Sequence, residues 1–280
     1  MPEVSVIIPT YNRWPMVSEA VASVVAQEGV DFELIVVDDG STDETGERLH
    51  CWVQKLTTTH PFRIVRIPNR GPAAARNLGV KLANSAMIAF LDSDDLWQPG
   101  KLQRQVTYMR ANPECGISQT EETWLRRGVR VNPGKRHLKR SGDLFFDSLR
   151  TCLVSPSAVI MRTDTFRAAG GFDEDLRAAE DYDLWLRLLI DLPVELLPAP
   201  LVIRRAGHPG QLSGTIPAID RFRILALLKL LLREDLAGKN RWAVCDVLVE
   251  KCGIYGMGAA RRGNLREAEF IARLAHLADA

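Results

Sequence analysis

The sequence predicts an α/β fold in which a mostly parallel central sheet is flanked by helices. Two observations carry this prediction. Over the first 112 residues, short runs of apolar and β-branched residues alternate with segments whose apolar residues recur at helical spacing. Residues 87–91 are apolar throughout, which is typical of a strand covered on both faces. Strands that alternate with helices favour parallel pairing, because each helix returns the chain to the same end of the sheet.

Each element of this half has its own signal. Strands are expected at residues 4–8, 34–37, 64–67 and 87–91, and helices at 16–26, 73–83 and 99–110. Ser41 and Glu44 have the spacing of a capping box and predict that another helix opens there. Pro99 suits the first turn of the helix that follows the fourth strand.

The composition changes near residue 112, so three parts are expected: 1–112, 113–215 and a helical appendage at 216–280. Further strands are expected at 154–161 and 196–204, and a helix at 179–190. The appendage is expected to contain a helical hairpin that turns at Gly263 and Asn264. Residues 126–140 hold seven Lys or Arg and no acid; they are interpreted as a solvated loop or as a contact for an anionic acceptor or membrane headgroups.

The overall composition excludes several classes of protein. Basic and acidic residues nearly balance, 36 against 35, so no nucleic-acid partner is expected and any anion recognition must be local. The five cysteines form no CxxC pair, which favours reduced thiols over a disulfide framework or a zinc site.

The same residues predict where the protein resides. The first ten residues lack the basic segment of a signal peptide, and the apolar stretch 224–232 is short and interrupted by Lys229. A cytoplasmic protein is expected. Peripheral contact with the inner face of the membrane and a homodimer both stay open.

Carboxylates gather where two expected strands end. Asp38 and Asp39 follow one strand, and Asp92, Asp94 and Asp95 follow another. Such residues often only cap turns. Two clusters at successive strand ends also suggest a divalent cation, because neighbouring carboxylates repel each other and a cation relieves the repulsion. Oxygen-ligated divalent cations typically bridge substrate phosphates, so a metal and a phosphorylated ligand are expected.

The sequence lacks two common phosphate-binding motifs, which narrows the classes of enzyme that it can belong to. No GxxxxGK[ST] occurs, and the first strand is followed by PTYNR rather than GxGxxG. The segment IAFLDSDDLW nearly matches the DxDx[TV] motif of phosphoaspartyl hydrolases, in which Asp92 would be the nucleophile. However, Leu96 replaces the expected Thr or Val, and the motif follows three earlier strands instead of opening the fold.

Six segments in order, from residue 4 to about 214, resemble glycosyltransferase family 2 and its GT-A fold: VSVIIPTYNR, FELIVVDDGSTDET, GPAAARNLG, IAFLDSDDLWQPGKL, GGFDEDL and AAEDYDLWLRL. The resemblance implies an inverting transferase that moves one sugar from a nucleotide-diphospho-sugar, most often a UDP-sugar, to an acceptor hydroxyl. The acceptor would be a sugar, a lipid-linked glycan or another glycan, in cell-surface polysaccharide or glycolipid synthesis. The QxxRW motif of processive synthases is missing, because Gly238 precedes Arg241-Trp242, so a non-processive enzyme is expected.

The resemblance also implies how the donor is bound. Pro9, Tyr11, Asp39 and Arg76 match nucleotide-binding positions. The alternatives without a role in binding are helix capping for Asp39, packing for Tyr11 and an exposed surface position for Arg76.

Asp92 and Asp94 match the DxD signature of the family. Asp92 would lie near the ribose, and Asp94 would bind Mn²⁺ or Mg²⁺ on the diphosphate. Asp95 is expected to support them or to cap the turn. His208 would add a metal ligand, unless it is an exposed loop histidine.

On the acceptor side, Asp181 matches the general base that accepts the proton of the attacking hydroxyl. Glu180 would orient its neighbour or the acceptor; alternatively, both acids only begin a helix, where they favour the helix dipole. Gly171 is expected in the loop beneath the acceptor, unless it simply forms a turn, and Trp185 on the helix beside it. A nucleotide-sugar binding protein without turnover stays open beside the phosphatase.

Overall fold

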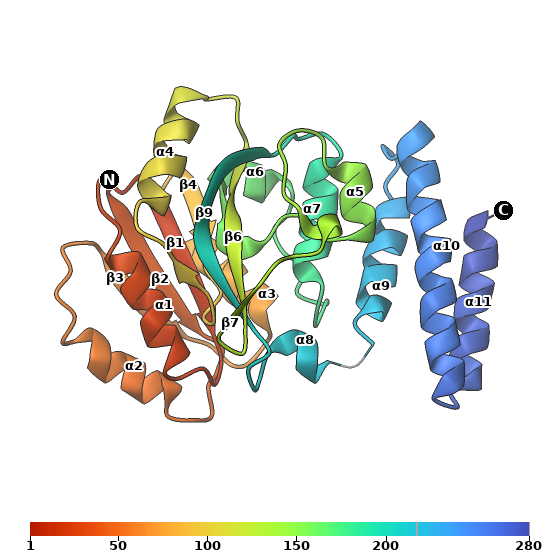
Figure 1. The fold of residues 1–280 in the computed structure, drawn as a ribbon, viewed down its shortest axis with the longest axis horizontal. Coiled ribbons are helices and arrows are strands. Elements are labelled where there is room, and N and C mark those ends of the chain that lie inside the picture. Colours follow the sequence, from red (N-terminus) through yellow and green to blue (C-terminus); the bar gives the residue numbers. More distant parts are fainter. Residues whose placement is uncertain (217, 280) are drawn as a thin grey trace.

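A computed structural model describes residues 1–216 and 218–279, and within these residues one nine-stranded mixed sheet crosses the molecule (Figure 1). In spatial order the strands are β3 (Phe62–Arg66), β2 (Phe32–Asp38), β1 (Val4–Thr10), β4 (Met87–Phe90), β8 (Val159–Arg162), β6 (Ile117–Arg126), β9 (Glu195–Ala206) and β5 (Leu96–Trp97), with β7 (Val129–Val131) paired to β6. The first four strands of the chain pair in parallel, which confirms the pairing predicted for this half. β8 runs antiparallel to both β4 and β6, so the sheet is mixed beyond residue 112.

Helices cover both faces of the sheet. One face carries α1 (Met16–Val25), α2 (Thr45–Val53) and α4 (Lys101–Ala111), and the other carries α3 (Pro72–Leu82), α6 (Thr163–Ala168) and α7 (Glu180–Leu189). Successive residues of β1 serve the two layers: Val6 and Ile8 pack with α1, whereas Ile7 packs with α3. Burial on both faces explains why these strands are apolar throughout.

The chain ends in helices that extend the second layer. After the short helices α5 (Phe145–Arg150) and α8 (Leu212–Thr215) come α9 (Asp220–Leu231), α10 (Gly238–Arg261) and α11 (Leu265–Asp279). Leu227 of α9 and Leu248 of α10 belong to the same apolar cluster as α7, so the appendage packs directly on the α/β core (Figure 1). The predicted turn at Gly263 is confirmed. Residues 217 and 280 of the predicted appendage lie outside the described residues.

Among the helices described, none combines the length and apolarity that crossing a membrane requires.

Three local predictions differ from the structure. The helix expected from Ser41 begins only at Thr45, because Ser41 Oγ accepts a hydrogen bond from the Asn12 amide (3.0 Å) and so ties the loop after β1 instead of capping a helix. Pro99 is not in the first turn of α4, which follows Gly100, a residue with a φ of +80°. The strand expected at 154–161 is confined to β8, and residues 156–158 form a 3₁₀ turn.

The contact of α3 with β1 depends on Gly79. A β-carbon at this position would lie 2.4 Å from Ile7 Cγ2, which is closer than real β-carbons come. We expect Gly79→Ala to lower the free energy of unfolding by about 1–3 kcal/mol through overpacking. Gly253 in α10 is the matched control, since a β-carbon there meets nothing within 4 Å in the described structure. Gly253→Ala should raise stability by about 0.5–1 kcal/mol. Urea unfolding of both variants measures this, and equal effects would contradict the close packing.

Candidate functional site

The carboxyl ends of β1, β2 and β4 meet at a cleft of about 1110 Å³, where ligands of open α/β sheets usually bind. Most predicted site residues line it: Pro9, Tyr11, Asp39, Arg76, Asp92, Asp94, Glu180 and Asp181. The end of β9 and the segment after it contribute further lining residues, among them Arg204, Gln211 and Ile219. The sheet therefore brings both predicted groups, donor side and acceptor side, to one cavity.

Asp92, Asp94 and Asp95 follow β4 and offer oxygens that all lie within 4.8 Å of one another. The Asp95 amide donates to the Asp92 carbonyl (2.9 Å), and this tight turn brings the three side chains together. Asp92 and Asp94 line the cleft with their side chains 32% and 19% exposed. Both are therefore accessible to a ligand.

Asp95 has a different surrounding. It is buried, accepts a hydrogen bond from Ser157 Oγ (2.7 Å) and another from the Arg205 amide (2.9 Å). Burial raises the pKa of Asp95 well above its usual value, and the neighbouring charges of Asp94 and Asp92 add to this. Its carboxyl thus joins β4 to β9 beneath the other two.

Arg76 connects the two sides of the cleft. It is buried in α3, donates to Asp92 Oδ1 (2.6 Å) and to Glu180 Oε1 (2.7 Å), and its guanidinium carbon lies 5.2 Å from the centroid of the Phe172 ring. Desolvation alone would lower the pKa of Arg76, but the two carboxylates outweigh it and raise the pKa. The interpretation of Arg76 as a surface arginine is therefore wrong.

Asp39 holds the loop between β3 and α3. Its Oδ1 accepts from the Arg70 amide (2.8 Å), and its Oδ2 accepts from the Gly71 amide (2.8 Å) and Asn69 Nδ2 (3.2 Å). Burial raises the pKa of Asp39, although these two amides oppose the change. Asp38 is buried as well, but it accepts from the Ser41 amide (2.9 Å) and is not among the described residues that line the cleft. Asp39 therefore faces the cleft from a fixed position.

Asp181 lies in the first turn of α7, where acids suit the positive end of the helix dipole. Glu180 next to it points to Arg76, whereas Asp181 lines the cleft and has its Oδ2 3.8 Å from Cys152 Sγ. Burial and the Asp181 charge raise the pKa of the Cys152 thiol well above its usual value, so this neighbour is a neutral thiol. The two adjacent acids thus have separate surroundings.

His208 reaches Asp94 from the loop after β9, with 2.9 Å between His208 Nε2 and Asp94 Oδ2. Arg13, which the sequence analysis did not single out, completes the contact. Its Nη1 lies 3.2 Å from His208 Nδ1 and 3.8 Å from Asp94 Oδ2, and its Nη2 donates to the Gly210 carbonyl (2.9 Å). The loop after β1 therefore holds the loop after β9 over the carboxylates.

A second group that the sequence did not indicate lies on the predicted acceptor side. Glu122 of β6, whose side chain is 2% exposed, lies 3.2 Å from Lys139 Nζ and 3.9 Å from Arg204 Nη1, while the Arg204 guanidinium lies 5.0 Å from the centroid of the Trp124 ring. Burial alone would raise the pKa of Glu122, but Lys139 and Arg204 lower it to about 2. Lys139 comes from the predicted basic loop, so one of its cations is a buried ion partner rather than a solvated charge.

Two predicted acceptor-side residues lie elsewhere. Trp185 is 1% exposed and packs in the apolar core, with its ring 6.4 Å from that of Phe172. Gly171 is buried behind the cleft, where a β-carbon would lie 2.9 Å from Asn77 Oδ1. Neither is among the described residues that line the cleft. Trp185 and Gly171 therefore pack within the protein, and their expected place on the acceptor side stays a prediction.

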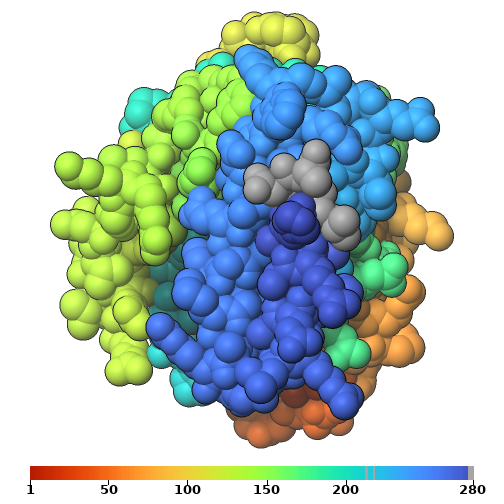
Figure 2. Space-filling view, turned by 90° about the vertical axis from the view of Figure 1, so that its right-hand side faces the viewer, coloured from red at the N-terminus to blue at the C-terminus, as the bar shows by residue number. Residues whose placement is uncertain are grey.

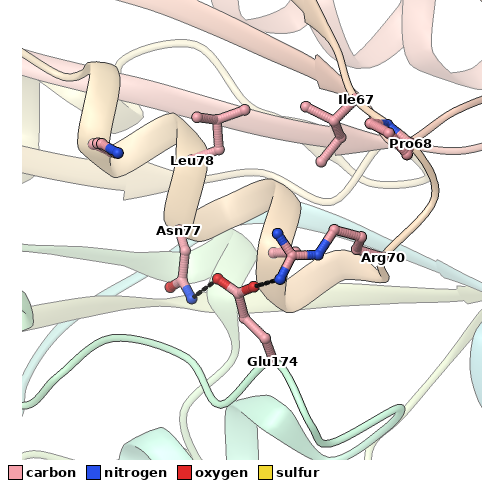
Figure 3. A pocket seen from close by; sticks show the side chains of 8 residues that line it. Ile67, Pro68, Arg70, Asn77, Leu78 and Glu174 are labelled. Carbon is pink, nitrogen blue, oxygen red and sulfur yellow. Dashed lines mark hydrogen bonds and ion pairs between the residues drawn. The ribbon is translucent and has the colours of Figure 1, made fainter.

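A smaller pocket of about 330 Å³ lies beside the cleft and shares Arg70 and Glu174 with it. Figure 3 shows Glu174 between Arg70 and Asn77: its Oε2 accepts from Arg70 Nη2 (2.8 Å) and its Oε1 from Asn77 Nδ2 (3.0 Å). These contacts tie the loop after Phe172 to α3. Glu174 thus forms part of the wall that separates the two hollows.

The residues around Asp94 fit a hard divalent cation. Carboxylate oxygens from two accessible aspartates and an imidazole nitrogen meet there, a donor set that suits Mg²⁺ or Mn²⁺. No cysteine takes part in this group within the described chain, which argues against a thiolate site.

Comparisons with known proteins agree with this geometry. Residues 5–167 match the family model described as Glycosyl transferase family 2. An uncharacterised glycosyltransferase of Rickettsia felis is 37% identical over 187 residues, which are 66% of this chain and 30% of that protein. One of Rickettsia typhi is 30% identical over 260 residues, covering 89% of this chain and 79% of the relative. The chain spans about a third of the length of the first of these relatives.

Solved structures show the same fold. Staphylococcus aureus TarS 1–349 in complex with UDP-GlcNAc superposes with a TM-score of 0.72 at 17% identity, over 97% of this chain and 90% of that chain. The mannosyltransferase PcManGT of Pyrobaculum calidifontis, in complex with GDP-Man and Mn²⁺, gives a TM-score of 0.63 at 20% identity, over 100% and 81% of the two chains. The fold is thus GT-A, and the chain belongs to glycosyltransferase family 2.

Proposed function

We propose that this chain is an inverting, non-processive glycosyltransferase that moves one sugar from a nucleotide-diphospho-sugar to an acceptor hydroxyl. The observation that carries the proposal is that Asp92 and Asp94 line the same cleft as Asp181, with Arg76 tying the two sides together. Family membership favours this function over both alternatives, the phosphatase and the non-catalytic binding protein. A UDP-sugar is the proposed donor, which the complex of TarS with UDP-GlcNAc supports.

Asp39 has a free hydrogen-bond acceptor position with which it can recognise a base. A carboxylate oxygen has two acceptor positions, and the hydrogen bonds of Asp39 use one on Oδ1 and two on Oδ2. One position on Oδ1 is left for a donor such as the imide N–H of uracil. Tyr11, 42% exposed at the same edge, offers a ring on which the base can stack, and Pro9 forms the floor beside it.

Asp94, with Asp92 and His208, would hold Mn²⁺ or Mg²⁺. When bound, the ion supplies positive charge that offsets the charge developing on the departing nucleoside diphosphate. Arg13 is part of the same arrangement because it positions His208 and the loop that carries it.

Asp181 would act as the general base. The acceptor oxygen forms a bond to the anomeric carbon while the bond from that carbon to the diphosphate oxygen breaks, and the acceptor proton passes to the Asp181 carboxylate. Glu180 is unavailable for this step because it is paired with Arg76, and it instead fixes the start of α7. Single displacement from the opposite side inverts the anomeric centre.

The proposal also assigns a role to each of the three parts of the chain. Residues 1–112 would bind the donor, residues 113–215 the acceptor, and the appendage 216–280 would serve packing, dimerisation or membrane contact. The acceptor would be a sugar or a lipid-linked glycan in cell-surface polysaccharide or glycolipid synthesis.

Asp181→Asn tests the proposed base. We expect turnover to fall by about 10²–10⁴, because the amide cannot accept the proton, while binding of the nucleotide is retained. The measurement is release of nucleoside diphosphate from UDP-, GDP- and dTDP-sugars with Mn²⁺, beside a thermal shift for binding. Asp175→Asn, at the exposed rim of the same cleft, is the matched control and should change little. Undiminished turnover in Asp181→Asn would refute the assignment.

Asp94→Asn tests the metal site. In the wild type, UDP with Mn²⁺ should stabilise the fold by about 2.7 kcal/mol when free ligand is 100 times its dissociation constant. We expect the variant to lose the metal-dependent part of this gain, as measured by thermal shift with and without Mn²⁺. Asp164→Asn on α6, whose side chain is 97% exposed, is the control. A full metal effect in Asp94→Asn would place the ion elsewhere.

Arg76→Met tests the link between the two sides. Removing the cation leaves Asp92 and buried Glu180 without their partner, and breaking a buried pair costs about 3–5 kcal/mol of unfolding free energy. Arg48→Met removes an exposed pair with Glu44 on α2 and should cost less than about 1 kcal/mol. Urea unfolding of both variants gives the comparison; similar costs would mean that the buried bridge is not a structural constraint.

A further inference from the structure

A turn between β6 and β7 carries an unpartnered group of cations. Arg126, Arg127 and Arg130 are exposed and form no ion pair among the described residues. Val129 between them is 66% exposed. Gly128 has a φ of +77° and a β-carbon there would meet nothing within 4 Å, so the turn projects from the molecule. We call residues 126–130 the hairpin turn.

The hairpin turn adjoins the mouth of the cleft. The Arg127 amide donates to the Ala206 carbonyl (2.9 Å), and Arg126 pairs with Ala206 in the β6–β9 register. A β-carbon at Gly207 would lie 3.2 Å from the Cγ atoms of both Arg126 and Arg127. His208, which contacts Asp94, is the next residue. The cations therefore flank the loop that lies over the carboxylates.

A second turn, between α10 and α11, has the same composition. Arg261, Arg262 and Arg266 are exposed and make no ion pair within the described chain, and Leu265 beside them is 63% exposed. Gly263 has open space around it, as Gly128 does. We call residues 261–266 the helical turn. The nearest following acid, Glu267, is engaged by Tyr255 and Asn264 rather than by these arginines.

The two turns lie toward the same edge of the molecule. In Figure 1 the β6–β7 connection and the α10–α11 connection both lie at the lower side of the view, as does α8, whose Thr215 lines the cleft. Figure 2 shows the segment around 120–140 projecting beside the terminal helices, whose connection lies at the bottom of that view. A single surface can thus reach both turns and the mouth of the cleft.

We propose that the hairpin turn and the helical turn dock this protein on an anionic lipid surface. Each turn combines three arginines with an exposed aliphatic side chain, and a headgroup layer accepts both: phosphates attract the cations, and the boundary with the acyl chains buries Val129 and Leu265. The near-neutral total charge, +1, means that this attraction is local to the turns. A soluble anionic polymer would leave the two aliphatic side chains in water.

Docking in this orientation presents the cleft to acceptors that are held at the lipid surface. That consequence depends on the proposed transferase function, whereas the docking itself does not.

Vesicle co-sedimentation, without nucleotide or metal, is the test. The full chain is mixed with vesicles of phosphatidylcholine alone or with about one third phosphatidylglycerol, at low and high salt. We expect binding only to the anionic vesicles, weakened by salt because the attraction is screened. R126Q/R127Q/R130Q and R261Q/R262Q/R266Q should each weaken binding by about 100-fold, as about 1 kcal/mol per basic residue implies.

The matched control removes the same charge elsewhere. Lys55, Arg63 and Lys81 are exposed cations on the donor half without ion pairs in the described residues, and K55Q/R63Q/K81Q should bind within about fivefold of the wild type. Circular dichroism and the thermal shift with UDP and Mn²⁺ establish that each variant is folded. The thermal shift also separates the two proposals. A protein that binds vesicles but shows no shift with UDP and Mn²⁺ contradicts only the proposed function, and one that shows the shift but does not bind vesicles contradicts only the docking.

The proposal is overturned if anionic vesicles do not bind the wild type, if either turn variant binds as well as the wild type, or if the control loses as much. Equal affinity for soluble polyphosphate would assign the turns to an anionic polymer instead. Loss of a dimer in both variants, with vesicle binding unchanged, would assign them to a second copy of the chain.

Discussion

The buried guanidinium of Arg76 is the interaction on which the arrangement of the cleft depends. Asp92 comes from the end of β4 and Glu180 from the start of α7, segments that are far apart in the chain. One cation between them fixes how far the end of β4 lies from the helix that carries Asp181. A cation that is already buried and shared is costly to remove, so the two sides of the cleft are held as one unit.

Charge is arranged in layers around the cavity. Accessible Asp92 and Asp94 face the space, and buried Asp95 joins the strands behind them. Burial is the main cause of the raised pKa of Asp95, and the charges of Asp94 and Asp92, which a divalent ion would offset, add to it. On the predicted acceptor side, Glu122 holds Lys139 and Arg204, and Arg204 brings positive charge to the cleft that the acids line.

The sequence predicted the first half well because its strands are apolar on both faces and its helices are amphipathic. Asp92 and Asp94 could be located because polar residues at strand ends stand out from such a background, whereas Asp181 could be located only through the resemblance to the family. β6 could not, because its residues from Glu121 onward are mostly polar and only partly buried, and its partners β8 and β9 are remote in sequence. The burial of Trp185 could not be predicted either. It depends on the contact with Phe172 and on how the helices pack on the sheet, which the sequence pattern does not reveal.

Residues missed at the site share one cause. Arg13 acts through His208, some 195 positions later, and Glu122 acts through Lys139 and Arg204, so their neighbours exist only after folding. Ser41 does not cap a helix for the same reason: its hydroxyl accepts a hydrogen bond from the Asn12 amide of another loop. Local spacing identifies the groups that face a ligand more readily than the groups that support them.

The way Asp39 is held has an evolutionary consequence. Its carboxylate is gripped by main-chain N–H groups of residues 70 and 71, which every amino acid except proline provides. The side chain of residue 70 is therefore free to diverge between descendants while the carboxylate keeps its position, whereas residue 71, with a φ of +95°, has to stay glycine and Asn69 Nδ2 itself contacts the carboxylate. A change at residue 70 can thus reshape the wall shared by the two hollows without moving the Asp39 carboxylate.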